Sequence, residues 1–329
     1  MGIDRHFAEF LIAARDGGID FGRVATIGRL NLFADFRSLK AAFARHGLAL
    51  ADGELRRLRA DGYSDAFLRH LGAKELTAID ASSYEGASII HDLNRPIDRS
   101  LVQRYSVVID GGTLEHIFDF ASAIRNCMEM LEVGGHFFCH TMANNFLGHG
   151  FYQFSPELFY RVFSPENGFR VLRMIEFESM IGRPKWYQPA DPQLIGERVE
   201  LVNTRPTYLL VHAQRIADVP LFASAPCQAD YSRHWSLGEA PSYAGSGLRS
   251  RIHRWGKSKN DLLMRWLPGF AYDYLLSALV RGLPRRGFRR RQYSLLPDLR
   301  SSGEVDAGKS GIGLSISRRA QRLLQRAST

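Results

Sequence analysis

Cysteine is scarce in this chain, and its three residues, Cys127, Cys139 and Cys227, stand far apart at unrelated spacings. A disulfide framework needs an even set of cysteines, and a structural zinc site needs ligands a few residues apart. Neither pattern is present. The sequence therefore predicts no metal site, and thiols that stay reduced as in a cytoplasmic protein.

Long apolar runs are missing as well. No stretch of about 18 uncharged apolar residues occurs, which argues against a membrane-spanning helix. Residues 1–18 carry Asp4, Glu9 and Asp16 within their apolar part. A secretory signal needs an uninterrupted apolar segment behind basic residues, so we expect none here.

A net positive charge is lacking outside the C-terminal part. The net charge is +9, yet residues 241–329 hold 18 Lys and Arg against 5 Asp and Glu, which leaves residues 1–240 at −4. The basic run Arg285–Arg291 follows an amphipathic helix pattern at Ala271, Tyr274, Leu275, Ala278 and Leu279. Three interpretations are open: a solvated tail, peripheral attachment to an anionic membrane surface, or nucleic-acid contact. The last is disfavoured because no nucleic-acid-binding module accompanies the run.

Short apolar runs alternate with helical patterns over the first half of the chain. Strands are predicted at Arg23–Ile27, Leu76–Ile79, Ser88–Ile90, Ser106–Ile109 and His136–His140. Apolar spacings of three and four predict helices around Leu39–Phe43, Phe67–Leu71 with Gly72 closing it, and Phe120–Leu131 with Asp119 as its cap. Short apolar strands separated by helices are typical of a parallel sheet.

Further along, the pattern changes. Gly134-Gly135 reads as a turn. Val171–Phe177 and Thr207–Ala213 suit an antiparallel pair at the edge of the sheet. Between that pair, Ile181–Leu194 is rich in proline and aromatic residues and is interpreted as an ordered insertion or a lid.

Four segments between residues 72 and 145 resemble class I S-adenosylmethionine-dependent methyltransferases in order and spacing. They are GAKELTAIDAS (72–82), SIIHDLNRPI (88–97), YSVVIDGGTLEHIFD (105–119) and CMEMLEVGGHFFCHTMANN (127–145). The segment HGFYQFSPELFYRVFSPENGFRV (149–171) is similar to a later stretch of the family. The resemblance covers about half of the chain, from Gly72 to Ala213.

The resemblance implies a Rossmann-like fold, S-adenosyl-L-methionine as cofactor, and a set of cofactor-binding positions. An acid after the second strand would hold the ribose, and an acid after the third would lie beside the adenine. On this sequence the implied cofactor residues are Gly28, Asp80, Asp92, Leu93, Asp110, Gly111 and Gly112. Asp80 and Asp92 have a plainer interpretation as caps of turns, and Gly111-Gly112 as a tight turn.

The chain departs from the family after the first strand. The family has a glycine-rich loop there, whereas Thr26–Asn31 reads TIGRLN, with one glycine. Gly28 and Asp80 are 52 residues apart, against about 20 in a dinucleotide-binding fingerprint. Either helices are inserted between the first two strands, or the loop has been rebuilt.

Glu115, His116 and His149 are the catalytic candidates. Methyl transfer from a sulfonium depends mainly on positioning, and a base is needed only where the acceptor carries a proton. Histidine titrates near neutrality and suits that task, although a structural role is the alternative for each residue. His149 and Tyr152 are expected in a loop over the crevice at the carboxyl ends of the strands.

Two further pairs of residues, one aromatic and one of histidines, each have a functional and a structural interpretation. Trp186 and Tyr187 would either close over a ring-shaped acceptor or anchor a loop on the core. His136 and His140 alternate along a strand without a further ligand at metal spacing, so they are interpreted as strand-face residues.

The sequence thus predicts an α/β fold: a Rossmann-like, doubly wound, mostly parallel sheet with an antiparallel edge pair and a C-terminal helical, basic extension. The domain spans residues 1–225, the extension 226–300 and a flexible tail 301–329. The predicted activity is methyl transfer to an O or N acceptor on a small-molecule or glycan-like substrate, in a cytoplasmic or membrane-peripheral protein. A methyltransferase-like protein without turnover is the alternative. A nicotinamide-dependent dehydrogenase is disfavoured because no G-x-G-x-x-G follows any strand.

Overall fold

The computed structural model describes residues 2–178, 185–237, 287–288 and 292–299. Its strands are β1 (Gly2–Ile3), β2 (Arg23–Ile27), β3 (Asn31–Leu32), β4 (Glu75–Asp80), β5 (Ile89–Ile90), β6 (Tyr105–Asp110), β7 (Leu131–Asn144), β8 (Phe169–Glu178), β9 (Trp186–Pro189), β10 (Thr207–Arg215) and β11 (Tyr293–Leu296). Its α-helices are α1 (Arg5–Asp16), α2 (Phe36–Arg45), α3 (Asp52–Leu58), α4 (Asp65–His70), α5 (Phe120–Met130), α6 (Pro156–Val162), α7 (Pro192–Ile195) and α8 (Ala229–Leu237). Short 3-10 helices are η1 (Arg99–Leu101), η2 (Leu114–His116) and η3 (Pro165–Asn167).

Five neighbouring strands of the central sheet are parallel, in the order β5-β4-β2-β6-β7. Counted along the chain, this is the 3-2-1-4-5 order of the doubly wound Rossmann fold. The chain first builds outward from β2 through β4, and it later returns to the other side of β2 with β6. The carboxyl ends of β2 and β6 therefore flank a topological switch point, where open α/β sheets bind ligands. The predicted Rossmann-like, mostly parallel sheet is confirmed.

The predicted antiparallel pair is present as β8 and β10. Strand β10 lies between β7 and β8 and runs antiparallel to both. The pair does not form the edge, because β9 pairs with β8 and β11 pairs with β9. The described part of Ile181–Leu194 therefore extends the sheet through β9.

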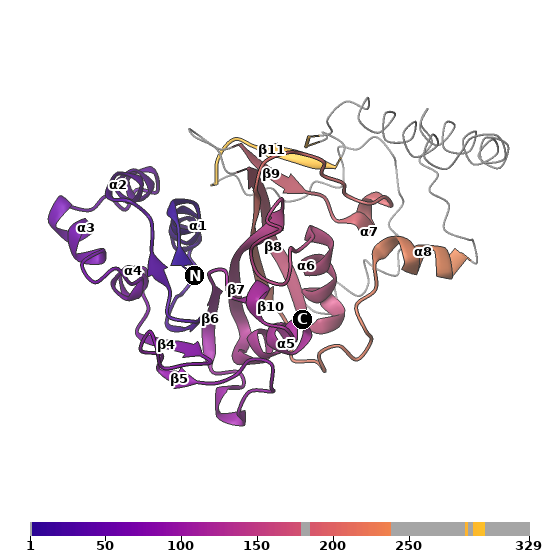
Figure 1. Cartoon of the computed structure of the whole chain (residues 1–329), viewed down its shortest axis with the longest axis horizontal. Coiled ribbons are helices and arrows are strands. Elements are labelled where there is room, and N and C mark those ends of the chain that lie inside the picture. Colours follow the sequence, from indigo (N-terminus) through magenta and orange to yellow (C-terminus); the bar gives the residue numbers. More distant parts are fainter. Residues whose placement is uncertain (1, 179–184, 238–286, 289–291, 300–329) are drawn as a thin grey trace, which may run out of the picture.

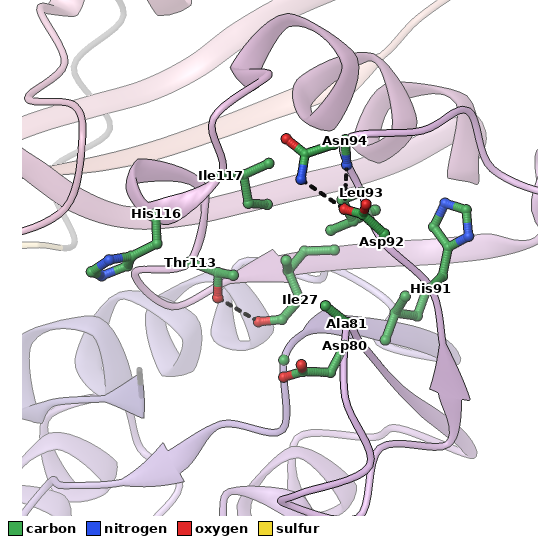
Figure 2. A pocket seen from close by; sticks show the side chains of 12 residues that line it. Ile27, Asp80, Ala81, His91, Asp92, Leu93, Asn94, Thr113, His116 and Ile117 are labelled. Carbon is green, nitrogen blue, oxygen red and sulfur yellow. Dashed lines mark hydrogen bonds between the residues drawn. The ribbon is translucent and has the colours of Figure 1, made fainter.

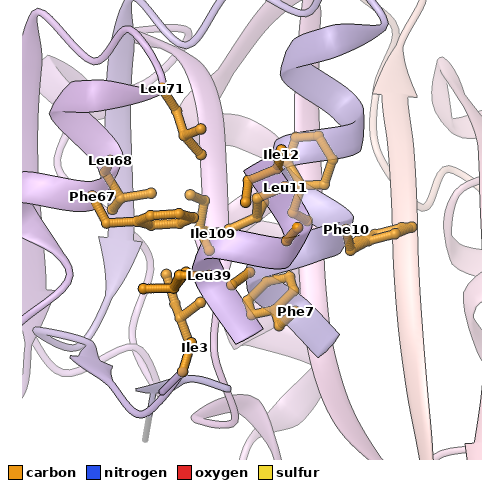
Figure 3. Close-up of a cluster of buried hydrophobic side chains, with 14 of the residues drawn as sticks. Ile3, Phe7, Phe10, Leu11, Ile12, Leu39, Phe67, Leu68, Leu71 and Ile109 are labelled. Atoms are coloured by element: carbon orange, nitrogen blue, oxygen red, sulfur yellow. The ribbon is translucent and has the colours of Figure 1, made fainter. Parts of the chain in front are cut away.

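Alternate residues of the strands point to opposite faces of the sheet and build two apolar cores. Figure 1 shows α1 to α4 on one side of the sheet and α5 and α6 on the other. On the first side, Phe7 and Leu11 of α1 and Leu39 of α2 belong to one core with Ile109 of β6 (Figure 3). Val108, the neighbour of Ile109, lies in the second core with residues of α5 and α6.

Helix α1 was not singled out by the sequence patterns. Asp4 caps it, because its Oδ1 accepts hydrogen bonds from the backbone N–H of His6 at 2.9 Å and of Phe7 at 2.8 Å. Phe7, Phe10 and Leu11 are buried at helical spacing. The acid that interrupts a signal-like run therefore begins a helix that covers the sheet.

The long separation of Gly28 from Asp80 has two causes. Helices α2, α3 and α4 are inserted between β2 and β4. The chain after Gly28 also runs into β3, which pairs in parallel with β1 in a separate two-stranded sheet. Both alternatives considered from the sequence therefore apply.

Strand β7 corrects one prediction. Gly134 and Gly135 were expected to form a turn before the strand, but both lie within the 14-residue β7. The pairing of β6 with β7 shifts register between Tyr105 and Val107, opposite this region. The glycines therefore mark an irregularity inside a long strand rather than its start.

The C-terminal part is described only at residues 287–288 and 292–299. There, Tyr293 and Leu296 of β11 are buried against the domain, and the ring of Phe288 stacks on Tyr187 at 3.7 Å between centroids. The segment predicted as an extension thus contributes a strand to the sheet, while the boundary at residue 225 stays a prediction. The predicted amphipathic helix, the tail 301–329 and most of the basic run lie outside the described residues.

Across the described parts of the chain, no helix combines the length and the apolar character needed to span a membrane.

Candidate active site

A cleft of about 440 Å³ opens at the carboxyl ends of β2, β4 and β6, at the switch point of the sheet (Figure 2). Its volume falls within the range of about 300–1,000 Å³ that is typical of small-molecule sites. It is lined by Ile27, Gly28, Ile79, Asp80, Ala81, His91, Asp92, Leu93, Asn94, Thr113, His116 and Ile117. Four of the predicted cofactor residues, Gly28, Asp80, Asp92 and Leu93, are in this set.

Asp80 is the last residue of β4 and lines the cleft. Its Oδ1 accepts a hydrogen bond from the backbone N–H of Ser82 at 3.0 Å. Asp80 thus caps the following turn and also presents a carboxylate at the cleft, so its two interpretations are compatible.

Asp92 lies across the cleft after β5. Its Oδ1 accepts hydrogen bonds from the backbone N–H of Asn94 at 3.0 Å and from Asn94 Nδ2 at 2.7 Å. These bonds lower the pKa of Asp92 below its ordinary value, so the group is ionised at neutral pH. The same segment is held in place by α5, because Asn126 Nδ2 donates to the carbonyl oxygen of Leu93 at 3.0 Å.

The residues that replace the glycine-rich loop turn away from the cleft. Arg29 Nε donates to Asp65 Oδ2 at 3.2 Å, and its guanidinium lies 3.8 Å from the ring centre of Tyr63. Arg29 also donates to the carbonyl oxygen of Glu85 at 3.2 Å. The guanidinium of Arg29 is therefore held by these neighbours, and Arg29 does not line the cleft.

Asp110 is the last residue of β6. It was expected to contact the cofactor, but its side chain is fully buried and does not line the cleft. Its Oδ1 accepts from the backbone N–H of Thr113 at 2.9 Å, and its Oδ2 accepts from Cys139 Sγ at 3.2 Å. Burial raises the pKa of Asp110 to about 6. The residue shapes the loop after β6 from within, because protein donors already occupy both oxygens.

Gly111 and Gly112, also predicted to bind the cofactor, do not line the cleft either. The backbone N–H of Gly2 donates to the carbonyl oxygen of Gly111 at 2.8 Å. A Cβ on Gly111 would lie 2.9 Å from Leu30 Cδ2 and 3.1 Å from the carbonyl oxygen of Gly2. Gly111 therefore permits the N-terminal strand and Leu30 to pack on this loop.

The three catalytic candidates come together beside the cleft. Glu115 is in η2, and its side chain is fully buried. Glu115 Oε2 accepts a hydrogen bond from Thr141 Oγ1 at 3.0 Å, and Oε1 lies 3.9 Å from His149 Nε2. Burial, followed by the charge of Asp110, raises the pKa of Glu115 to about 8.

His116 joins this group to the cleft, which it lines. Its ring centre is 4.9 Å from that of His149. Burial, followed by the charge of His149, lowers the pKa of His116 below its ordinary value. A neutral imidazole at the edge of a ligand cleft can accept a proton from a bound group.

Several residues of the cleft were not singled out from the sequence. Thr113 fastens the loop after β6 to the end of β2, because its Oγ1 donates to the carbonyl oxygen of Ile27 at 2.8 Å. His91 and Asn94 flank Asp92 in the sequence and line the same wall. Their nearness to a predicted aspartate was the only signal in the sequence.

The other aromatic candidates stabilise the fold. Trp186 is largely buried and packs on Phe177 at 4.9 Å between ring centres, which supports the anchoring interpretation. Tyr152 donates through its hydroxyl to the carbonyl oxygen of Phe118 at 2.6 Å. His136 Nδ1 lies 3.0 Å from Nε2 of His212, a buried histidine of β10, as expected of a strand-face residue.

No family model matches the chain, and no curated protein matches it. Solved structures with similarity to it include the N-methyltransferase NodS from Bradyrhizobium japonicum in complex with S-adenosyl-L-homocysteine, at 14% identity and TM-score 0.35, covering 65% of this chain and 87% of NodS. Another is a didemethyltoxoflavin N1-methyltransferase from Burkholderia thailandensis, at 12% identity and TM-score 0.35, covering 65% of this chain and 78% of that one. A third is a branched-chain polyamine synthase from Thermus thermophilus, at 14% identity and TM-score 0.31, covering 68% of this chain and 61% of that one.

Proposed function

We propose that this chain is an S-adenosyl-L-methionine-dependent methyltransferase. The observation that carries the proposal is the cleft at the switch point, with Asp80 at the end of the second parallel strand and Asp92 after the third. A carboxylate at the end of that second strand can accept hydrogen bonds from the hydroxyls of a ribose. These are the positions at which the sequence resemblance places the adenosyl part of the cofactor.

The cofactor, when bound, supplies an electrophilic methyl group. In the cleft, Asp80 would hold the ribose, and Leu93 and Ile117 would pack against the adenine. His116 would accept the proton that an O or N acceptor releases as the methyl group is transferred. Its lowered pKa keeps it in the neutral form that this role requires.

The acceptor is proposed to be a small molecule or a glycan-like compound. His116 lines the cleft, and the half-exposed His149 lies beside it at 4.9 Å between ring centres, so an acceptor can approach from that side. The glycan class is carried over from the family resemblance of the sequence alone.

Calorimetric titration of the purified chain with S-adenosyl-L-methionine, S-adenosyl-L-homocysteine and NAD tests the assignment. We expect binding of the first two and none of NAD. Binding of NAD alone would replace the proposal with a dehydrogenase. If none of the three compounds gave a binding heat, the cofactor assignment would be removed and only the binding-protein alternative would remain.

A non-catalytic binding protein is the second candidate, and the chain after Gly28 favours it. Where the family has glycines, Arg29 is tied to Asp65 and Leu30 packs on Gly111. Methylation assays with labelled cofactor and pools of metabolites and glycans separate the two candidates. Cofactor binding without transfer to any pool would favour the non-catalytic role.

A further inference from the structure

Three side chains of the kinds that can bind a metal ion lie together, and one of them, His116, lines the cleft. One ligand atom from each of Glu115, His116 and His149 lies within 4.8 Å of the other two. The residues come from η2 and from the loop after β7, which are more than thirty positions apart in the chain. The pairing of these histidines with the carboxylate is therefore a product of the fold and not of a local motif.

The carboxylate of Glu115 is incompletely satisfied. Its Oε2 accepts the hydroxyl of Thr141, but Oε1 is buried and has no hydrogen-bond partner. A buried carboxylate oxygen without a donor is costly, and such a group is usually paired with a donor, a charge or a metal ion. His149 Nε2 lies 3.9 Å from Oε1, which is beyond hydrogen-bond distance.

Backbone contacts hold Glu115 next to the loop that carries His149. The carbonyl oxygen of Glu115 accepts hydrogen bonds from the N–H of Phe151 at 2.7 Å and of Tyr152 at 3.3 Å. Between these residues and His149 stands Gly150, with φ +68°. A Cβ at Gly150 would lie 2.7 Å from the carbonyl oxygen of Glu115. Glycine at this position therefore permits the contact that brings His149 to Glu115.

We propose that Glu115, His116 and His149 form a binding site for one divalent transition-metal ion, with zinc as the reference ion. Two imidazoles and one carboxylate are typical ligands of zinc, cobalt and iron, whereas magnesium and calcium prefer oxygen ligands. Metal–ligand bonds of about 2.0–2.2 Å require the ligand atoms to approach by roughly one ångström. Rotation of His149, whose side chain is 45% exposed, can supply much of that change.

Three protein ligands leave coordination positions open, as in catalytic rather than structural zinc sites. Because His116 also lines the cleft, an open position would face the ligand there. Resting on the proposed function, the ion would bind an oxygen or nitrogen of the methyl acceptor and orient it. With the ion present, His116 would serve as its ligand and not as the base, and the ion would lower the pKa of the bound acceptor group so that its proton leaves to solvent. Thr141 would act as a positioning residue, since it holds Glu115 Oε2 and leaves Oε1 toward the histidines.

Metal binding by the untagged, full-length chain after chelator treatment tests the proposal. We expect about one equivalent of Zn²⁺ or Co²⁺ by calorimetry and by elemental analysis after dialysis, a visible Co²⁺ absorption band, and a rise in Tm on adding Zn²⁺. Mg²⁺ should produce none of these effects.

His149→Ala and His116→Ala should abolish the stoichiometric binding and the Co²⁺ band. Thr141→Val should weaken Zn²⁺ affinity about 10- to 100-fold. His70→Ala, which removes an exposed histidine from α4, should bind the ion as the parent chain does. Unchanged binding in His149→Ala, or no stoichiometric binding by the parent chain, would overturn the site.

Titration of S-adenosyl-L-methionine with chelator present separates the two proposals. Cofactor binding without zinc binding would remove the metal site and leave the methyltransferase assignment intact. Zinc binding without cofactor binding would remove the methyltransferase assignment and leave the metal site intact.

Discussion

Asp80 is the residue on which recognition of the cofactor most directly depends. It ends β4, lines the cleft and has one oxygen engaged with the backbone of Ser82. Hydrogen bonds to a charged group contribute about 1.5–3 kcal/mol, so their loss weakens binding about 10- to 100-fold.

We therefore expect Asp80→Ala to reduce the affinity for S-adenosyl-L-methionine by about 10- to 100-fold in calorimetry. Glu75→Gln is the matched control, because Glu75 is an exposed acid at the opposite end of the same strand. Equal affinities of Asp80→Ala and the parent chain would remove the ribose contact from the proposal.

A second prediction at the residue scale concerns Glu176 of β8. It is 2% exposed and hydrogen-bonded to the Tyr293 side chain of β11. Burial raises the pKa of Glu176 from 4.5 to about 7. Because the pKa is higher in the folded chain, the unfolded chain releases this proton first. Stability contributed by the protonated form is present below pH 4.5 and is lost as the pH rises toward about 7.

Glu176→Gln should remove this loss. We expect the difference in the free energy of unfolding, Glu176→Gln minus parent chain, to be roughly 3 kcal/mol larger at pH 7.5 than at pH 4.5. Urea unfolding of both chains at the two pH values measures it. The comparison between two pH values cancels the constant cost of placing an amide in the site. A difference that does not change with pH would show that Glu176 is not protonated in the fold.

At the scale of elements, the N-terminal strand and helix cover the loop that carries the catalytic candidates. Strand β1 reaches this loop through the hydrogen bond from Gly2 to Gly111, and Leu30 fills the space beside it. The side chain of Phe7 in α1 packs near His140 of β7, at 5.5 Å between ring centres. This cover leaves no space for a side chain at position 111.

Gly111→Ala should therefore destabilise the chain by about 1–3 kcal/mol in urea unfolding, because the new methyl group overpacks a closed interface. Gly53→Ala is the control. Nothing lies within 4 Å of a Cβ there, and the site is in helix α3, so that variant should be unchanged or up to about 1 kcal/mol more stable. A stable Gly111→Ala would mean that β1 moves away without cost.

At the scale of the whole molecule, the charge asymmetry leaves the basic run of 285–291 open to the interpretations given above. One of them, contact with an anionic membrane surface, makes a testable prediction. Each arginine near an anionic bilayer surface contributes about 1 kcal/mol. The contact cannot be tested cleanly by truncating the chain at Leu262, because this would also remove β11, which pairs with β9 and buries Tyr293 and Leu296.

Replacement of the five arginines of 285–291 by glutamine keeps β11 in place. We expect the parent chain to co-sediment with phosphatidylserine-containing vesicles in a salt-dependent way, and the variant to lose at least tenfold in vesicle affinity. Equal partitioning of both chains would identify the run as a solvated segment.

The sequence by itself determined the strands of the parallel sheet and some of the cleft residues that follow them, among them Asp80 and Asp92. Apolar runs and the residues that end them are local features, so Asp80 and Asp92 could be placed at the rim without tertiary information. Because parallel strands end at one edge of a sheet, two aspartates that follow neighbouring strands must lie near each other.

Only the tertiary structure decided where the third aspartate points and which residues meet Glu115. Asp110 also ends a strand, but donors from its own loop and from Cys139 turn it inward. His149 reaches Glu115 through a loop whose path depends on contacts with the backbone of residue 115. Side-chain direction after a strand depends on long-range packing, and no local periodicity encodes it.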